Sequence, residues 1–172
     1  MTSGGRQLVV RTRRVFDVPA DSVWPLLCNS KMDHSSALLF KLGVPQPLEC
    51  RLPAGQGVGA ERECISDQGT IHQRILVWSP PAKMVFRMER LDVPSARGID
   101  DIEESFDLEP SSRGVAVTRT TRVRVGRGFS LWKRFELRLG LKQVHRYVFR
   151  NWQRLARPGS PVVPTPELKL AQ

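Results

Sequence analysis

The sequence predicts an α+β domain with a seven-stranded antiparallel sheet, two short helices after the first strand, and one long C-terminal helix. Two observations carry this prediction. Runs rich in β-branched and aromatic residues fill much of residues 7–125, and short turn sequences separate them. Residues 129–156 then change to a helical period, with apolar residues three and four positions apart. A chain of this length can bury one core, so we expect a single domain over residues 1–156 and a flexible proline-rich tail over 157–172.

The N-terminal elements are a strand and two short helices. Residues 7–17 form the first strand, and Pro19 ends it because proline cannot continue a central ladder. The first helix then covers about residues 20–28. We expect the second helix near residues 34–42, where Gly43 suits the left-handed backbone of a C-cap.

Six further strands follow the helices. Turn-forming residues such as Asp67-Gln68-Gly69 and Ser79-Pro80-Pro81 separate them. Links this short join antiparallel neighbours in hairpins, whereas parallel strands need long crossover connections. The predicted strands are residues 47–52, 57–66, 70–78, 83–91, 99–109 and 114–125.

The C-terminal helix carries two apolar faces. One is a stripe made of Leu137, Leu141, Val144, Val148, Trp152 and Leu155. Nearly opposite that stripe, the first half places four apolar residues: Leu131, Trp132, Phe135 and Leu139. Gly140 interrupts the helix directly after these four residues, so we expect a kink or a change of packing partner there. Basic residues recur at every fourth position from Arg134 to Arg154, a row that winds round the helix and is typical of a solvated face.

Composition narrows the class of protein. The net charge of +10 favours acidic partners such as nucleic acid, anionic lipid or an acidic protein, without choosing among them. No apolar run reaches the roughly 18 residues of a membrane span. Residues 1–7 lack the apolar core of a secretory signal, so we expect a cytoplasmic protein.

The cysteines and histidines show no pattern of a disulfide framework or a metal site. The three cysteines are widely spaced at Cys28, Cys50 and Cys64, and the three histidines are scattered. We therefore expect reduced thiols, no metal site and no cofactor.

Strand alternation predicts one mostly apolar inner face. A turn at Gln68-Gly69 would set Glu63 opposite Arg74, and the last hairpin would set Glu104 opposite Arg119. The predicted inner face contains Val58, Ala60, Arg62, Cys64, Ile71, Gln73, Ile75, Val77, Met84, Phe86, Met88, Arg90, Ile102, Glu104, Phe106, Leu108, Val115, Val117, Arg119 and Thr121.

Five polar residues interrupt this inner face: Arg62, Gln73, Arg90, Glu104 and Arg119. An unpaired charge inside a core is costly, so one interpretation is a structural ion pair between Glu104 and Arg119. The other is a partly hydrated cavity in which Arg62, Gln73 and Arg119 orient the polar head of a ligand. The two interpretations are compatible.

Three short sequence motifs occur in an order that is typical of one known superfamily. Residues 15–27 read VFDVPADSVWPLL, residues 57–62 read GVGAER, and residues 78–86 read WSPPAKMVF. They resemble the opening strand with Pro-Ala-x-x-Val-Trp-x-x-Leu, the G-x-G-x-x-R strand start and the W-x-P-P-x-x-L-x-F hairpin of the SRPBCC (START-like, polyketide cyclase/dehydrase-like) superfamily. The resemblance covers about residues 8–156. It implies a helix-grip fold, in which a curved sheet wraps around the C-terminal helix and encloses a cavity.

This resemblance implies ligands such as lipids, sterols, polyketides, quinones or plant hormones. We expect binding or transport of a small hydrophobic or amphipathic molecule, and the arginines favour an anionic one such as a fatty acid or polyketide carboxylate. One alternative is a cyclase/aromatase-like or dehydratase-like enzyme, with Glu104 as the candidate acid–base residue. The superfamily's cyclases place a serine and an arginine where this chain has Arg62 and Cys64, which argues against cyclase chemistry.

The second alternative is a basic module for anionic membranes or nucleic acid. Phosphate contacts weaken steeply as salt rises, so ligand binding that persists in high salt would favour the cavity. We expect the partner to be a small hydrophobic or amphipathic ligand and not a specific nucleic acid. We expect no membrane span, and a homodimer is one option for the oligomeric state. The candidate ligand-binding residues are Arg62, Gln73, Ile75, Met84, Phe86, Met88, Glu104, Phe106, Val117 and Arg119.

Overall fold

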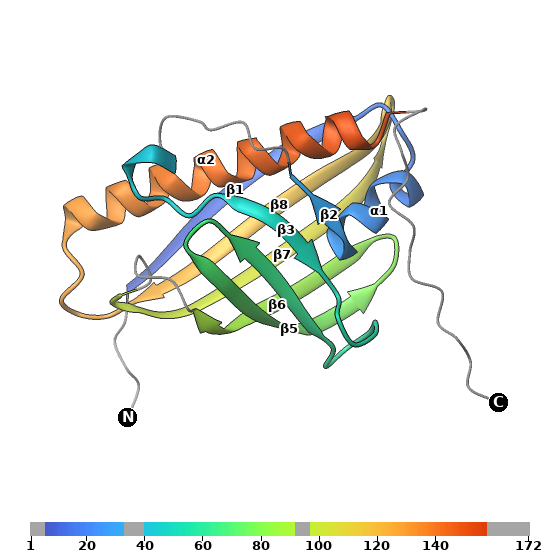
Figure 1. The fold of residues 1–172 in the computed structure, drawn as a ribbon. Helices are drawn as coiled ribbons and strands as arrows, with labels where there is room; N and C mark the ends of the chain where they lie inside the picture. Colours follow the sequence, from blue (N-terminus) through green and yellow to red (C-terminus); the bar gives the residue numbers. More distant parts are fainter. Residues whose placement is uncertain (1–5, 33–39, 92–96, 158–172) are drawn as a thin grey trace.

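The structure, a computed structural model, describes residues 6–32, 40–91 and 97–157. Within these residues, eight antiparallel strands curl around a long helix in the order β1-β8-β7-β6-β5-β4-β3-β2 (Figure 1). The strands are β1 (Arg6–Phe16), β2 (Ser30–Lys31), β3 (Pro47–Arg51), β4 (Glu61–Ser66), β5 (Gly69–Ser79), β6 (Lys83–Leu91), β7 (Ile99–Ser111) and β8 (Gly114–Val125). The helices are α1 (Ala20–Cys28), the 3-10 helix η1 (Phe40–Leu42) and α2 (Leu131–Leu155).

This architecture confirms the predicted α+β helix-grip fold. The described part of the sheet has one strand more than predicted, because β2 pairs with β3 at the sheet edge. The second short helix was expected near residues 34–42. Its last three residues are described and form the 3-10 helix η1, which Gly43 follows with φ +96°. Residues 33–39 and 158–172 lie outside the described ranges.

The β4–β5 hairpin turns one position earlier than predicted. Ser66 pairs with Gly69, so Asp67 and Gln68 form the turn. The Ser66 hydroxyl fixes this turn, since it donates to the Gly69 carbonyl at 2.8 Å and accepts from the Gln68 N–H at 3.2 Å.

The earlier turn changes the pairing but not the faces. Glu61, rather than Glu63, lies opposite Arg74. Because this shift in pairing is two residues, each side chain stays on its predicted side. Arg62 therefore pairs with Gln73, and both are buried on the inner face.

Three residues predicted to face inward do not. Val58 is exposed in the turn before β4, which begins only at Glu61. A bulge before Val77 exposes that residue. A second bulge beside His72 places Arg90 on the outer face, with its Nη2 3.0 Å from His72 Nε2. The predictions for Val77 and Arg90 are wrong because one extra residue reverses the alternation of a strand.

The register of the last hairpin also differs from the prediction. Glu104 lies opposite Thr121, and Arg119 lies opposite Phe106. Glu104 and Arg119 are therefore diagonal neighbours on one face, a separation that a long arginine side chain spans.

α2 lies across the concave face of the sheet (Figure 1). Ser130 caps it by accepting a hydrogen bond from Lys133 N at 3.2 Å. The helix continues through Gly140, where a Cβ would lie 3.1 Å from Val44 Cγ2, so glycine permits this close approach. Trp152 packs in a cluster with Phe16, Phe106 and Phe149. A second cluster is made of Leu8, Val10, Ile102, Val123 and Val125, with Leu137 and Leu141 packed against it.

Candidate ligand-binding site

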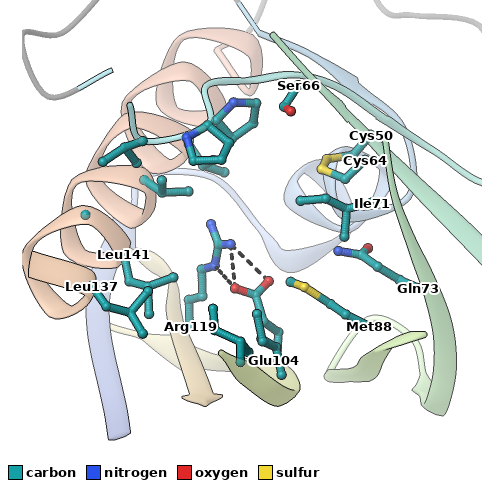
Figure 2. A pocket seen from close by; sticks show the side chains of 18 of the residues that line it. Cys50, Cys64, Ser66, Ile71, Gln73, Met88, Glu104, Arg119, Leu137 and Leu141 are labelled. Carbon is teal, nitrogen blue, oxygen red and sulfur yellow. Dashed lines mark hydrogen bonds and ion pairs between the residues drawn. A yellow bond between two sulfur atoms is a disulfide. The ribbon is translucent and has the colours of Figure 1, made fainter. Parts of the chain in front are cut away.

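A cavity of about 620 Å³ lies between the inner face of the sheet and α2 (Figure 2). Small-molecule sites typically measure roughly 300–1,000 Å³. One wall is the apolar stripe of α2, which contributes Leu137, Leu141, Val144, Val148 and Trp152. The sheet contributes further apolar side chains, among them Ile65, Ile71, Met88, Ile102 and Phe106.

Exposed lining residues mark where the cavity meets solvent. They are Gly43, Arg97, Lys133, Glu136 and Leu139. Three of them belong to the N-terminal half of α2, so the cavity opens beside that part of the helix.

Glu104 and Arg119 form a buried ion pair in the cavity wall (Figure 2). Arg119 Nη2 lies 2.7 and 2.9 Å from the two carboxylate oxygens, and its Nε donates to Oε1 at 3.2 Å. The Thr121 hydroxyl donates to the same Oε1 at 2.7 Å. Burial alone would raise the pKa of the Glu104 carboxyl, but Arg119 and these hydrogen bonds outweigh it and lower the pKa. Glu104 is therefore ionised.

A buried histidine extends this network. An ionised Glu104 can only accept, so the Thr121 hydroxyl proton points to it, and Thr121 Oγ1 accepts from His145 Nε2 at 2.7 Å. His145 Nδ1 then accepts from the Thr12 hydroxyl at 3.0 Å. Burial, followed by the charge of Arg119, lowers the pKa of His145 to about 3, and the ring is neutral. The sequence prediction missed this chain, although His145 follows Leu141 by four positions on the helix.

Arg62 is the second buried cation of the cavity. Its Nε donates to the Leu27 carbonyl at 3.0 Å, its Nη1 donates to Gln73 Oε1, and its Cζ lies 4.7 Å from the centre of the Phe86 ring. Burial lowers the pKa of Arg62 to about 10, against the opposing effect of Glu104, so the group remains cationic at neutral pH. Its direct partners among the described residues are all uncharged, and Nη2 makes no hydrogen bond to any of them.

Within the described chain, three ionised side chains are buried: Arg62, Glu104 and Arg119. The single carboxylate is bound by Arg119. Among the buried groups of the cavity wall, one guanidinium is therefore in excess of the carboxylates.

The ten candidate ligand-binding residues separate into two groups. Arg62, Gln73, Met88, Glu104, Phe106 and Arg119 line the cavity. Ile75, Met84, Phe86 and Val117 are fully buried in the protein interior and are not part of the lining. Sequence alternation identifies the face of a residue, but it does not separate side chains that pack together from those that border empty space.

The prediction of three reduced cysteines is wrong in the structure. Cys50 on β3 and Cys64 on β4 form a disulfide whose sulfur atoms are 2.09 Å apart, and both line the cavity (Figure 2). The two residues lie directly opposite each other in the β3–β4 ladder. Cys28 is free and buried, and burial raises the pKa of its thiol to about 11.

Among the described residues, one metal-compatible group lies on the outer face, although no metal site was predicted. Ligand atoms of Glu61, Glu63 and His72 lie within 4.8 Å of one another. His72 Nδ1 is 2.9 Å from Glu61 Oε1, and Arg51 lies 2.9 Å from Glu63. Arg51 already pairs with one of these carboxylates and the three residues are partly exposed, so this group is explained as a surface network of polar contacts.

Comparison with solved structures supports the fold. Protein MLL2253 from Mesorhizobium loti superposes with a TM-score of 0.56 at 17% identity, covering 87% of this chain and 96% of its own. Protein CV1439 from Chromobacterium violaceum gives 0.56 at 14% identity, covering 87% and 98%. Ara h 8.0201 gives 0.61 at 10% identity, covering 88% and 98%. No curated protein matches the sequence.

A family model covers nearly the whole described chain. The model described as "polyketide cyclase / dehydrase and lipid transport" matches residues 7–157. The matched residues include all of α2 and the whole sheet apart from Arg6, the first residue of β1. The chain therefore belongs to the polyketide cyclase/dehydrase and lipid transport family of the SRPBCC superfamily.

Proposed function

We propose that the protein binds or transports a small amphipathic molecule with an anionic head, of the fatty-acid or polyketide-carboxylate kind. Its apolar part would occupy the cavity, and its carboxylate would meet Arg62. The observation that carries this proposal is the uncompensated charge of Arg62, which is only 3% exposed. A buried cation without an anionic partner is costly, and a bound carboxylate would remove that cost.

The cavity walls suit the rest of such a molecule. The apolar stripe of α2 lines the cavity together with Met88 and Phe106, and these side chains would contact the chain of the ligand. Methionine adapts its shape readily, which suits a flexible ligand. Gln73 holds Arg62 from one side and leaves its Nη2 without a partner among the described residues.

The state of Glu104 supports binding over acid–base catalysis. Arg119 and Thr121 together donate several hydrogen bonds to its carboxylate. With the pKa of this carboxyl lowered, the group serves as a permanent anion rather than as a proton donor near neutral pH.

Arg62→Met tests the assignment of the anionic head. We expect this variant to bind dodecanoic acid about tenfold to a hundredfold more weakly, the usual loss for one charge-assisted hydrogen-bonded contact. Binding of dodecanol, which has the same chain without the charge, should change by less than about twofold. Displacement of a fluorescent apolar probe measures both affinities.

Two further variants complete this experiment. Arg74→Met removes an exposed arginine that pairs with Glu89 on the other side of the sheet, and it should leave both affinities unchanged. Arg62→Lys should keep the preference for the acid over the alcohol. Equal wild-type affinity for acid and alcohol, or an unchanged affinity for the acid in Arg62→Met, would refute the anionic head. Failure of wild type to bind either compound would refute ligand binding in the cavity.

A further inference from the structure

The first half of α2 exposes four large apolar side chains. Leu131 is 73% exposed, Trp132 68%, Phe135 52% and Leu139 44%. On a helix of 3.6 residues per turn, they fall within an arc of about 100°. The rings of Trp132 and Phe135 lie 5.8 Å apart, so the two aromatic residues form one continuous surface. These four residues are the docking patch.

The docking patch is separate from the apolar stripe that lines the cavity. Leu137 and Leu141 point from the same helix into the cavity (Figure 2). Leu131, Trp132 and Phe135 lie on nearly the opposite side of the helix and outside the cavity lining, and Leu139 lies at the cavity mouth. Isolated exposed apolar residues are common, but a contiguous group on one helix face indicates an interaction surface.

Charge around the docking patch limits the kind of partner. Residues 127–146 contain six basic side chains and one that is acidic, Glu136. Lys142 and Arg146 are exposed and continue the same face beyond Leu139. A second copy of this chain, with its net charge of +10, would bring like charges together. A negatively charged partner matches the patch.

We propose that the docking patch inserts into the surface of an anionic lipid bilayer. Apolar residues with an exposed tryptophan on one face, together with lysine and arginine, are typical of helices that lie in the membrane interface. No helix of the described residues has the length and apolar character to cross a membrane, so this contact is peripheral.

Docking would bring the cavity mouth to the lipid. Lys133, Glu136 and Leu139 belong to both the exposed first half of α2 and the cavity lining. A ligand could then pass between bilayer and cavity without crossing water. This transfer of a ligand between bilayer and cavity rests on the proposed function, whereas membrane docking itself does not.

Vesicle binding tests the docking patch. Wild-type protein should co-sediment with phosphatidylcholine vesicles that contain about a third phosphatidylglycerol, and roughly tenfold less with pure phosphatidylcholine. High salt should weaken binding to the anionic vesicles, because it screens the basic residues. Trp132 is the one largely exposed tryptophan of the described chain, so its emission should shift to the blue on binding. Trp132→Phe should lose this shift and keep most of the binding.

Paired variants locate the surface. The double variant Trp132→Ser with Phe135→Ser should bind anionic vesicles roughly tenfold more weakly. Arg138→Gln with Lys142→Gln should also weaken binding. Arg11→Gln with Arg13→Gln removes the same charge from exposed positions on β1 and should have a smaller effect.

Three results would overturn the docking proposal. One is wild-type binding that does not distinguish anionic from neutral vesicles. Another is equal binding by wild type and the double serine variant. The third is a wild-type protein that is a dimer at the concentration of the assay, together with a double serine variant that is a monomer. A second copy of the chain would then cover the docking patch. The serine variant should still bind dodecanoic acid in solution, which separates this test from that of the cavity.

Discussion

His145 lies at the centre of the polar network that joins α2 to the sheet. It bonds to Thr121 on β8 and to Thr12 on β1, and Glu104 on β7 accepts from Thr121. Each bond has a defined direction only while the imidazole is neutral and Glu104 is ionised. The pKa of His145 falls to about 3, mainly because of burial, so a proton binds the unfolded chain more readily than the folded protein.

This difference predicts a pH-dependent stability. Between about pH 6.5, the ordinary pKa of histidine, and pH 4.5, the unfolded chain takes up a proton at residue 145 and the folded protein does not. The free energy of unfolding should therefore fall as pH falls, by up to about 1.4 kcal/mol per pH unit. In His145→Gln, urea unfolding at several pH values in this window should show a much smaller slope.

His72→Gln is the control for this measurement. It removes a half-buried histidine from the outer face, outside the buried network, so the loss of slope in His145→Gln should exceed any change in this variant. A His145→Gln slope equal to that of wild type would show that His145 is not buried in the neutral form.

Among the elements of the fold, β3, β4 and β5 form one part of the cavity wall. The disulfide between Cys50 and Cys64 joins β3 to β4, and it closes a loop with a sequence separation of 14 residues. A cross-link around a loop of this size commonly stabilises a protein by about 3 kcal/mol through the entropy of the unfolded chain.

Thiol titration tests this pairing. The folded protein should react slowly, since its remaining thiol, Cys28, is buried and the pKa of that thiol is raised to about 11. Denatured without a reductant, the chain should expose one thiol, and after reduction it should expose all three cysteines. Three reactive thiols in the denatured, unreduced protein would contradict the disulfide.

Sequence alternation predicted which residues of β7 and β8 face inward, including Ile102, Phe106 and Val117. It failed on β5 and β6, because nothing in the local sequence marks the bulges that turn Val77 and Arg90 outward. It also set two hairpins two residues out of register, since several residues near each turn could have formed it. A shift of two residues leaves each side chain on the same side of the sheet, so Glu104 and Arg119 still lie close together on the inner face.

Long-range contacts account for what the sequence did not predict in the site. The pairing of Cys50 with Cys64 depends on strand register, which the spacing of cysteines does not specify. The role of His145 depends on hydroxyls from β1 and β8, which are distant in the chain. The membership of the cavity lining depends on how closely α2 approaches the residues around it, as at Gly140, which lies beside Val44 in the segment before β3.

For the whole molecule, the central claim is that the space between sheet and α2 receives a ligand. Two apolar clusters pack parts of that interior, and a cavity of about 620 Å³ remains. The first cluster is rich in aromatic residues, and the second joins the strands to the first half of α2. An interior with this much apolar wall and so few polar groups is typical of sites for hydrophobic molecules.

Filling the cavity tests that claim most directly. Leu141 points into the cavity (Figure 2), so Leu141→Trp should occupy the ligand's space and weaken dodecanoic acid binding at least about tenfold in the displacement assay. Leu131→Trp adds the same side chain at an exposed position outside the lining and should bind the acid like wild type. If folded Leu141→Trp protein binds the acid as tightly as wild type, the ligand does not occupy this cavity.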